Sequence, residues 1–343
     1  GGGPLGLVGW QAAFLAVGLP GLLLALWVAT LREPPRGLAD GILTPPTERP
    51  FRGFLDELLT VIPPLTLIGA ARRGIGPLAV NVAGGLGIAA LAWSLIAATG
   101  DGAQWVAVGV GAYAVFSWAA ALRTRDRPAF ALIWGSPAFL LVVVGYGLIA
   151  FTAYAVSFWS LPYLERSFGV SKAVAGLVVG GAGATGGFLG VVLGGRLADR
   201  WRRNNPAGRI AVILIGAITP IPLMITSFTT GSVTLFYALH LPMVGLSSAA
   251  LGAAAAATQD LVLPRMRGAA TATFFIGTTL IGLALGPYMA GRVSAWSGDL
   301  ATGVLSLLLV APLSIAALVL AYRLVPRAEA SLRDRARAVG EPV

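Results

Sequence analysis

The sequence predicts an all-α membrane protein, and three observations lead to that prediction. Hydrophobic residues make up 57% of the 343 residues and charged residues only 11%, whereas soluble domains carry about 25% charged residues. Apolar stretches recur with about the 20 residues that one helix needs to cross a bilayer core. The basic residues cluster between these stretches, as they do in membrane proteins. Lipid is therefore the solvent that we expect for most of the chain.

Nine apolar stretches are predicted to span the membrane, and the first of them is one of the shorter ones. Residues 1–8 look like the end of a further helix. Since the chain begins with Gly1 rather than Met, we expect it to start inside a longer protein, without a signal peptide at this position. The predicted spans are 13–31, 78–99, 104–122, 135–161, 173–195, 210–228, 233–257, 269–291 and 301–322.

The basic residues give the predicted spans an orientation. When the loops are assigned alternately to the two sides of the membrane, 21 of the 24 Lys and Arg residues fall on one side and 3 on the other. Basic loops mark the cytoplasmic side. We therefore expect a multi-pass protein of the cell inner membrane with a cytoplasmic C-terminus. One overlooked span would mix the two sides, so the separation also supports the number of spans.

Two polar segments lie outside the predicted spans. Residues 32–77 are rich in Pro and charge and predict a cytoplasmic linker, while residues 325–343 predict a cytoplasmic tail that forms a frayed helix. Apolar residues at helical spacing beside charged ones predict a short amphipathic helix on the membrane surface within the linker. These apolar residues are Phe51, Phe54, Leu55, Leu58 and Leu59.

The residues needed for most enzyme and cofactor chemistry are scarce. Cysteine is absent, which excludes disulfides, thiolate nucleophiles and Cys-based metal sites, and His240 is the only histidine. No membrane-buried pair of acids is evident, and no GxxxxGK[ST] loop precedes Lys172, the only lysine. We therefore expect no enzyme activity, no cofactor and no metal. The basic residues form no single patch of the kind that binds nucleic acid.

A motif between two predicted spans, residues 194–203 (GGRLADRWRR), carries the clearest resemblance to a known family. It resembles the G-x-L-a-D-r-x-G-r-r signature of the major facilitator superfamily, except that Arg202 stands where the family prefers Gly. In that family the loop is a gating latch whose Asp meets a helix N-terminus and a nearby Arg. The alternative for Asp199 is a solvated charge in a basic loop. The residues to which the latch role is carried over are Gly195, Asp199 and Arg200.

An internal similarity extends this resemblance. Residues 3–6 (GPLG) echo the start of residues 286–291 (GPYMAG), and the superfamily contains two repeated six-helix halves in which helices five and eleven correspond. The resemblance implies a helical bundle in which residues 1–31 hold the end of helix five and helix six, and residues 135–324 hold the C-terminal six helices. Residues 78–122 are then an inserted helix pair, and helices one to four are missing.

A narrower resemblance is to the Spinster-like subgroup of this superfamily. It rests on Gly9-Trp10, Phe14, residues 18–21 (GLPG), residues 32–37 (REPPRG) and the segment 263–291. Proteins of this subgroup are associated with lysophospholipids and sphingolipid-type substrates, so the resemblance implies a lipid-like substrate. The Arg-Glu-Pro element also occurs in organic-anion transporters of the same superfamily, which keeps drug or organic-anion transport as an alternative.

Polar side chains on two predicted spans form a candidate substrate cavity. Helices seven and ten line the cavity in this superfamily, and Tyr146, Tyr154 and Ser157 share one face of the first at about 100° per residue. His240 and Ser247 share a face of the second. Imidazole titrates near neutral pH, so His240 is a candidate to carry a proton or contact an anionic head group. The alternative is that these groups satisfy hydrogen bonds between packed helices.

Glycines at four-residue spacing in the span 173–195 predict close helix contacts, because small residues let helix backbones approach one another. The Gly-Pro element near residue 286 is interpreted in the same way. The candidate packing residues are Gly180, Gly183, Gly187, Gly190, Gly286 and Pro287.

Together these features favour a secondary active transporter that works by alternating access. Its partners are expected to be the lipid bilayer, a small amphipathic or organic substrate and a coupling ion, either proton or sodium, and the complete protein is expected to be a monomer. A non-transporting scaffold formed by a truncated chain is the other alternative. Substrate-dependent ion flux in vesicles separates transport from scaffolding.

Overall fold

The computed structural model describes residues 8–32 and 50–342, and all the regular elements in these residues are helices. The chain divides into two units, residues 1–50 and 51–343, which are considered separately. In the first unit, α1 (Gly9–Ala29) is one helix with Pro20 in its interior. None of its apolar window is buried, as suits a helix surrounded by lipid. Residues 1–7, which belong to the end of helix five predicted at residues 1–8, and the linker residues 33–49 lie outside the described residues.

Nine helical segments in the described residues are long and apolar enough to cross a membrane. Each corresponds to one predicted span, and the prediction of an all-α membrane protein is confirmed. Most segments extend beyond the apolar run that predicted them, because a helix continues into the polar residues at its ends. The segments are Gln11–Ala29, Ile75–Thr99, Gly102–Arg125, Pro137–Phe168, Lys172–Arg202, Gly208–Thr229, Val233–Asp260, Pro264–Ser297 and Leu300–Ala330.

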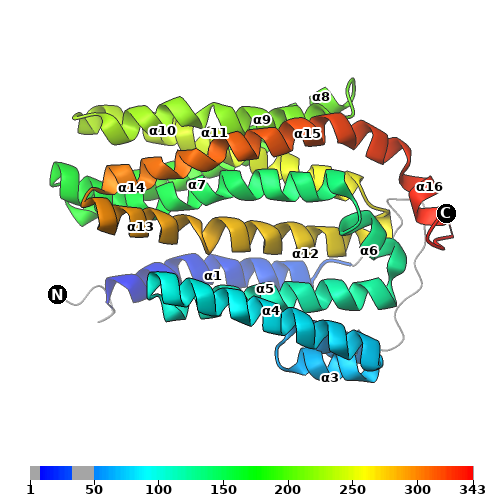
Figure 1. Cartoon of the computed structure of the whole chain (residues 1–343). Helices are drawn as coiled ribbons and strands as arrows, with labels where there is room; N and C mark the ends of the chain where they lie inside the picture. Colours follow the sequence, from blue (N-terminus) through cyan, green and yellow to red (C-terminus); the bar gives the residue numbers. More distant parts are fainter. Residues whose placement is uncertain (1–7, 33–49, 343) are drawn as a thin grey trace. The chain divides into compact units, whose positions relative to one another are not determined.

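The helices that follow α1 are numbered in chain order, and Figure 1 shows α7 to α15 side by side with their axes roughly aligned. Three short elements are not α-helices. The elements η3 (Pro264–Met266) and η5 (Leu307–Val310) are 3-10 helices, and η4 (Thr279–Leu283) is a π-helix. The α-helices are α2 (Pro50–Val61), α3 (Leu65–Arg72), α4 (Ile75–Thr99), α5 (Gly102–Arg125), α6 (Arg127–Ile133), α7 (Pro137–Phe168), α8 (Lys172–Arg202), α9 (Gly208–Ile218), α10 (Pro220–Thr229), α11 (Val233–Asp260), α12 (Arg267–Thr278), α13 (Gly286–Ser297), α14 (Leu300–Ser306), α15 (Ala311–Ala330) and α16 (Leu332–Arg337).

Aromatic packing holds one end of the α7–α15 bundle together. The Tyr163 ring lies 4.8 Å from the Phe228 ring and 5.6 Å from the Phe236 ring, measured between centroids. The Tyr163 hydroxyl donates to the carbonyl oxygen of Phe228 at 3.2 Å. Lipid tails are as apolar as these side chains, so close packing and satisfied polar groups, rather than exclusion of water, must hold the helices together.

Glycines bring α8 and α11 into backbone contact. A Cβ built at Gly190 would lie 2.2 Å from the carbonyl oxygen of Gly245, and one at Gly194 would lie 2.5 Å from the Cα of Ala249. Side chains at these two positions would therefore force the helices apart. Gly286 makes a similar approach to α7, where its Cβ would lie 2.1 Å from the carbonyl oxygen of Phe151.

The other candidate packing glycines lie on a different face of α8. Nothing in the described part of the chain comes within 4 Å of a Cβ built at Gly180, Gly183 or Gly187. The described residues therefore provide no packing partner for these three glycines, and their packing role stays a prediction. The four-residue spacing alone did not indicate which glycine row would face α11.

The span that contains α12 and α13 is interrupted between them. The π-helix η4 precedes Gly286 and Pro287, and proline cannot donate the backbone hydrogen bond that a regular helix requires. Side chains from elsewhere bind the carbonyl groups around this interruption. The Gln104 amide donates to Ala284 O at 2.7 Å, and the Trp159 indole donates to Pro287 O at 2.8 Å.

The linker contains two helices in its described part. The predicted amphipathic helix corresponds to α2, whose Phe51, Phe54 and Leu55 are exposed. The helix α3 was not predicted, and neither was α6, because both are too short to show a clear period in the sequence. On α2, Glu57 accepts hydrogen bonds from the Trp118 indole and the Arg125 guanidinium of α5. Residues after Tyr322, expected to fray, continue as α15 and α16.

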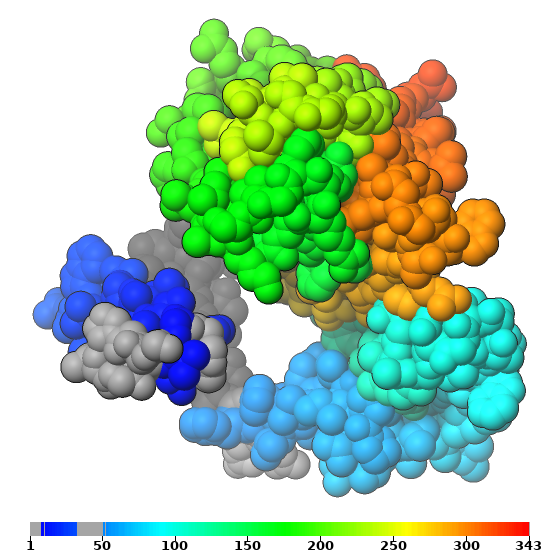
Figure 2. Space-filling view, turned by 90° about the vertical axis from the view of Figure 1, so that its left-hand side faces the viewer, coloured from blue at the N-terminus to red at the C-terminus, as the bar shows by residue number. Residues whose placement is uncertain are grey.

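The α4–α5 pair is joined to the bundle by polar contacts at both ends. At one end, Tyr288 donates to Asp101 at 2.6 Å, and Arg292 lies 3.3 Å from the same carboxylate. Figure 2 shows this end of the pair, in cyan, bordering α13, in orange. At the other end, Asp126 pairs with Arg265 at 2.7 Å. We call the latter end the arginine-rich side, since most of the arginines in residues 50–342 lie in the helix ends and short helices there.

Candidate functional site

The structure brings the five candidate cavity residues together. They line one cavity of about 260 Å³ between α7, α8, α10 and α11. Most of the remaining wall is apolar, and the described residues that line it include no Asp, Glu, Lys or Arg. We call it the hydroxyl-lined cavity. Its five candidate residues are Tyr146, Tyr154, Ser157, His240 and Ser247.

His240 is the most constrained residue of this wall. It is 1% exposed, and its ring stacks on that of Phe236 at a centroid distance of 5.4 Å and an angle of 16°. Its Nδ1 atom is buried without a hydrogen-bond partner in the described residues. A buried polar atom without a partner is costly. His240 thus lines the cavity with one ring nitrogen that has no hydrogen bond in the described residues.

The tyrosines and serines contribute hydroxyl groups from two helices. Tyr146 is buried with its ring 5.3 Å from that of Phe274, whereas Tyr154 is 41% exposed and accessible from the cavity. Ser247 donates to the carbonyl oxygen of Met243 at 3.0 Å in its own helix. That bond satisfies the Ser247 donor and leaves its oxygen free to accept from a substrate. The cavity thus offers several hydrogen-bonding groups in an apolar setting.

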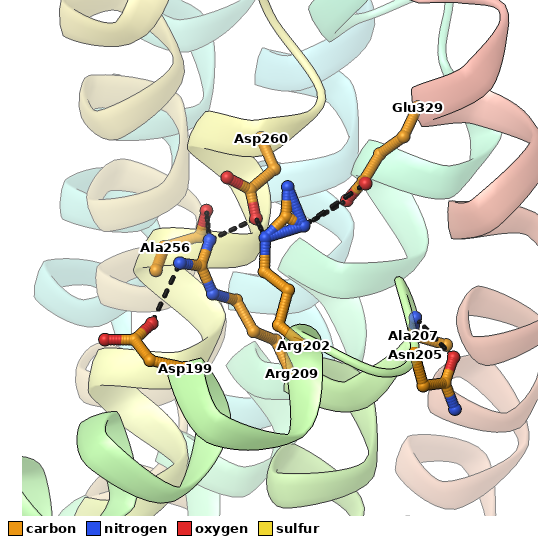
Figure 3. A network of polar contacts seen from close by, with 8 residues as sticks. All are labelled: Asp199, Arg202, Asn205, Ala207, Arg209, Ala256, Asp260 and Glu329. Atoms are coloured by element: carbon orange, nitrogen blue, oxygen red, sulfur yellow. Dashed lines mark hydrogen bonds and ion pairs between the residues drawn. The ribbon is translucent and has the colours of Figure 1, made fainter.

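A second polar site, which we call the arginine network, lies at the arginine-rich side (Figure 3). Asp199, near the end of α8, pairs at 2.9 Å with Arg209, which lies in the first turn of α9. Arg209 also binds Asp260, at the end of α11, and donates to the carbonyl oxygen of Ala256 at 3.2 Å. The Asp199 carboxylate thus meets an arginine at the start of a helix.

Arg202 extends this network to α15. Its guanidinium lies 3.2 Å from the Asp260 carboxylate and 3.2 Å from the Glu329 carboxylate. The side chains of Asp260 and Glu329 are only 18% and 17% exposed, so both carboxylates depend on these arginines for compensation. Figure 3 shows that the two arginines lie between acids from three different helices. The network therefore ties α8, α9, α11 and α15 together at one level.

The sequence identified only part of the arginine network. Arg200 is exposed and makes no ion pair in the described part of the chain, and nothing there lies within 4 Å of a Cβ at Gly195. Arg202, the departure from the family motif, is instead a central member. Two features of the sequence could have indicated these further members of the network. One is Arg202, which stands where the family motif has Gly, and the other is the presence of the acids Asp260 and Glu329 in strongly basic segments. Among the described residues, no cluster of His and acidic side chains could hold a metal ion.

Comparison with known proteins identifies the family. A model of the Major Facilitator Superfamily matches residues 147–343, which include the arginine network and all the lining residues of the hydroxyl-lined cavity except Tyr146. The chain belongs to the Major Facilitator Superfamily. Its predicted fold class is thereby confirmed, and the chain falls in a family of transporters rather than of enzymes. The resemblance drawn from the motif at residues 194–203 identified this superfamily correctly.

Individual members of the superfamily are more distant. The chain is 31% identical over 186 residues to an MFS-type efflux pump of Mycolicibacterium smegmatis, and 29% identical over 193 residues to protein spinster homolog 1 of Xenopus laevis. These matches cover 52% and 50% of this chain. They cover 42% and 37% of the relatives, so the chain matches less than half the length of either.

Solved structures of the superfamily include a bacterial homologue of the human lysosomal transporter Spinster. Its inward-facing, unoccupied form is 20% identical to this chain with a TM-score of 0.46, covering 79% of this chain and 68% of that chain. Its inward-facing, occupied form is also 20% identical, with a TM-score of 0.45 and coverages of 67% and 58%.

Proposed function

We propose that this protein is a secondary active transporter that works by alternating access and carries a lipid-like, amphipathic substrate such as a lysophospholipid. The observation that carries the proposal is the wall of the hydroxyl-lined cavity. Hydroxyl groups and one imidazole lie among apolar side chains, without a fixed charge in the described residues. Such a wall suits a substrate with a long apolar part and a few polar groups. The similarity to spinster homologues supports the same substrate class.

The arginine network has a place in this mechanism. We assign it the role of a gate that holds the ends of α8, α11 and α15 together in one state and releases them in another. Alternating access needs such a contact on each side of the substrate site. A proton or sodium gradient is the proposed energy source. The proposal further places the arginine-rich side in the cytoplasm, the protein in the inner membrane and the working form as a monomer.

Transport in proteoliposomes tests the proposal directly. Purified protein is reconstituted, and uptake of a fluorescent lysophospholipid is measured with and without a proton or sodium gradient. We expect gradient-dependent uptake that falls about tenfold in His240→Ala and Ser157→Leu, since one lost polar contact of about 1.4 kcal/mol corresponds to that factor. Tyr237→Phe, on α11 outside the cavity wall, should transport normally. If the uptake is the same with and without the gradient, and the same in the cavity variants as in the wild type, the result would favour a non-transporting scaffold.

Efflux of drugs or organic anions is the second candidate function, and the 31% identity to an efflux pump favours it. His240 is the feature of the cavity that fits an organic anion, because a protonated imidazole attracts negative charge. The two candidate functions, lipid transport and organic-anion efflux, predict different inhibitors of transport. A lipid carrier should be inhibited by zwitterionic lysophospholipids more strongly than by small aromatic anions. The opposite order of inhibition would support organic-anion efflux.

A further inference from the structure

A second, larger cavity lies along α4 and α5 and shares no residue with the hydroxyl-lined cavity. Its volume is about 540 Å³, and α3, α4 and α5 provide its walls. On α4 it runs from Asn81 to Ile96, a distance of about 22 Å at 1.5 Å per residue. One leaflet of a bilayer core is about 15 Å thick. This long groove therefore has the dimensions of an extended acyl chain.

Small residues leave this groove open. Gly85, Ala89 and Gly109 form part of its wall, and the Tyr113 ring lies 3.1 Å from a Cβ built at Gly85. None of the apolar window of α4 is buried by the rest of the described chain. The groove thus faces the surroundings of the helix pair, and for a pair of membrane-spanning length these surroundings are lipid.

One fully buried side chain in the groove, Asn81, has an amide oxygen without a hydrogen-bond donor in the described residues. Asn81 is 0% exposed, and its amide nitrogen donates to the carbonyl oxygen of Pro77 at 3.1 Å. Its Oδ1 atom has no donor in the described residues, and the buried Ser117 hydroxyl of α5 is also unpaired. Asn81 is the α4 residue of the groove nearest the arginine-rich side. A ligand that supplies a hydroxyl donor at this end would satisfy the amide oxygen.

An uncompensated cation precedes the groove. Arg73 directly follows α3, and its Nε and Nη2 atoms are buried without hydrogen-bond partners in the described residues. Burial and the nearby Arg125 charge lower the pKa of Arg73. Glu57 pairs with Arg125 at 3.0 Å, so that acid is already engaged by the other arginine. Arg73 is therefore short of an anion.

We propose that the groove binds one anionic phospholipid from the leaflet at the arginine-rich side. Its phosphate pairs with Arg73, a head-group hydroxyl donates to Asn81 Oδ1, and one acyl chain lies along α4 toward Ile96. Phosphatidylglycerol combines these three features. Basic pockets beside membrane helices favour anionic head groups, and a phosphate accepts several hydrogen bonds from one guanidinium. The site is independent of the transported substrate.

Native mass spectrometry tests the head-group contact. The protein is released from vesicles containing equal amounts of phosphatidylglycerol, phosphatidylethanolamine and phosphatidylcholine, and retained lipids are counted. We expect one phosphatidylglycerol per chain, reduced about tenfold in Arg73→Gln and reduced, to a smaller extent, in Asn81→Leu. Arg72→Gln, the exposed neighbour, is the matched control and should retain the lipid. Equal loss in both arginine variants, or equal retention of all three lipids, overturns the proposal.

A second pair of variants tests the chain-binding part of the groove. Ala89→Trp fills the groove and should abolish retention, whereas Ala90→Trp, on the exposed surface of α4 outside the groove, should preserve it. Glycerophosphoglycerol, the water-soluble head group, should not displace the lipid, because it lacks the acyl chain. Displacement by this compound would mean that the site binds a free phosphodiester, contrary to the proposal. Size-exclusion profiles of all variants establish that they remain folded.

Discussion

The α7–α15 bundle and the α4–α5 pair are both built from apolar, glycine-rich helices, yet they pack in different ways. In α7, 61% of the most apolar window is buried within the protein, against 22% in α5 and none in α4. In the bundle, Gly190 brings one backbone onto another. In the pair, an aromatic ring occupies the space beside Gly84, where a Cβ would lie 2.0 Å from the Phe116 ring. Two other glycines of the pair, Gly85 and Gly109, line the groove. The same residue type therefore supports a tight backbone contact in the bundle, and a ring contact and an open groove in the pair.

This difference indicates that the two regions depend on different forces. The bundle is held by close packing along its length, so its stability should be sensitive to side-chain volume. The α4–α5 pair relies more on polar contacts at its ends, through Asp101 and Asp126, and should be sensitive to charge and hydrogen bonding. Four variants examine this comparison.

Gly190→Ala should have the largest effect. The added Cβ would lie 2.2 Å from the carbonyl oxygen of Gly245, and backbone cannot move aside as a flexible side chain can. Overpacking of this kind costs about 3 kcal/mol, which should appear as a marked drop in the thermal unfolding temperature in detergent. Gly187→Ala is the matched control and should be neutral or slightly stabilising, since alanine favours helix. Equal effects of the two changes would contradict the assignment of the packing face.

Arg209→Gln should have the next largest effect, again in the bundle. The change removes the arginine that pairs with Asp199 and leaves Asp260, which is largely buried, with Arg202. We expect a loss of about 2 kcal/mol, below the range for a fully buried pair because the network is partly exposed. Thermal unfolding measures the loss, and the accessibility of a cysteine introduced near Asp260 measures opening of the gate. Arg200→Gln should leave both unchanged; a similar effect there would show that overall charge, not the network, is responsible.

Gln104→Leu examines the joint between the pair and the bundle. It removes the hydrogen bond to Ala284 O, where η4 interrupts the helix. One neutral hydrogen bond contributes about 1 kcal/mol, so the unfolding temperature should change little. Hydrogen exchange of the α13 amides should nevertheless become faster. The conservative control Ser94→Ala removes a bond within α4 and should leave α13 unaffected. Unaltered exchange in Gln104→Leu would mean that this joint does not stabilise the interruption.

Asp126→Asn should have the smallest effect and should depend on pH. Hydrogen bonding to Arg265 lowers the pKa of Asp126 from its ordinary value of 3.8, with burial opposing and the Ala129 amide assisting. The charged pair therefore contributes its full stabilisation of the folded protein at pH values above the ordinary pKa of 3.8. This contribution is lost as the pH falls through the lowered pKa of the folded state. Asp126→Asn should lose a little stability at neutral pH and show a flatter decline below about pH 4. Asp56→Asn, an exposed acid on α2, should follow the wild-type curve.

The spans were predictable because lipid requires a long apolar run whatever the helix packs against. The five cavity residues were found through helical spacing and the resemblance to the superfamily, and the structure places them on one wall. The acids that bind Arg202 could not be found in this way. Asp260 and Glu329 come from helix ends far from Arg202 in the sequence, and only the packing of α11 and α15 brings them near it.

The interruption around Pro287 could not be predicted from hydropathy, because hydropathy depends only on composition. The segment 269–291 carries no charged residue and is apolar on average, and a π-helix does not alter composition. The groove along α4 could not be anticipated either, since its open space depends on which side chains of α5 face Gly85 and Ala89. Sequence patterns indicated which residues lie in the membrane, whereas the contacts between helices decided what each residue does.

The indole of Trp159 provides a built-in spectroscopic reporter. Its N–H binds Pro287 O, and its ring lies 2.8 Å from a Cβ built at Gly291. Any separation of α7 from α13 must break this bond and change the polarity around the ring. Fluorotryptophan incorporated at the protein's nine tryptophans would give a resonance, assignable with Trp159→Phe, that follows this movement. Conformational cycling could then be observed without attaching a foreign label.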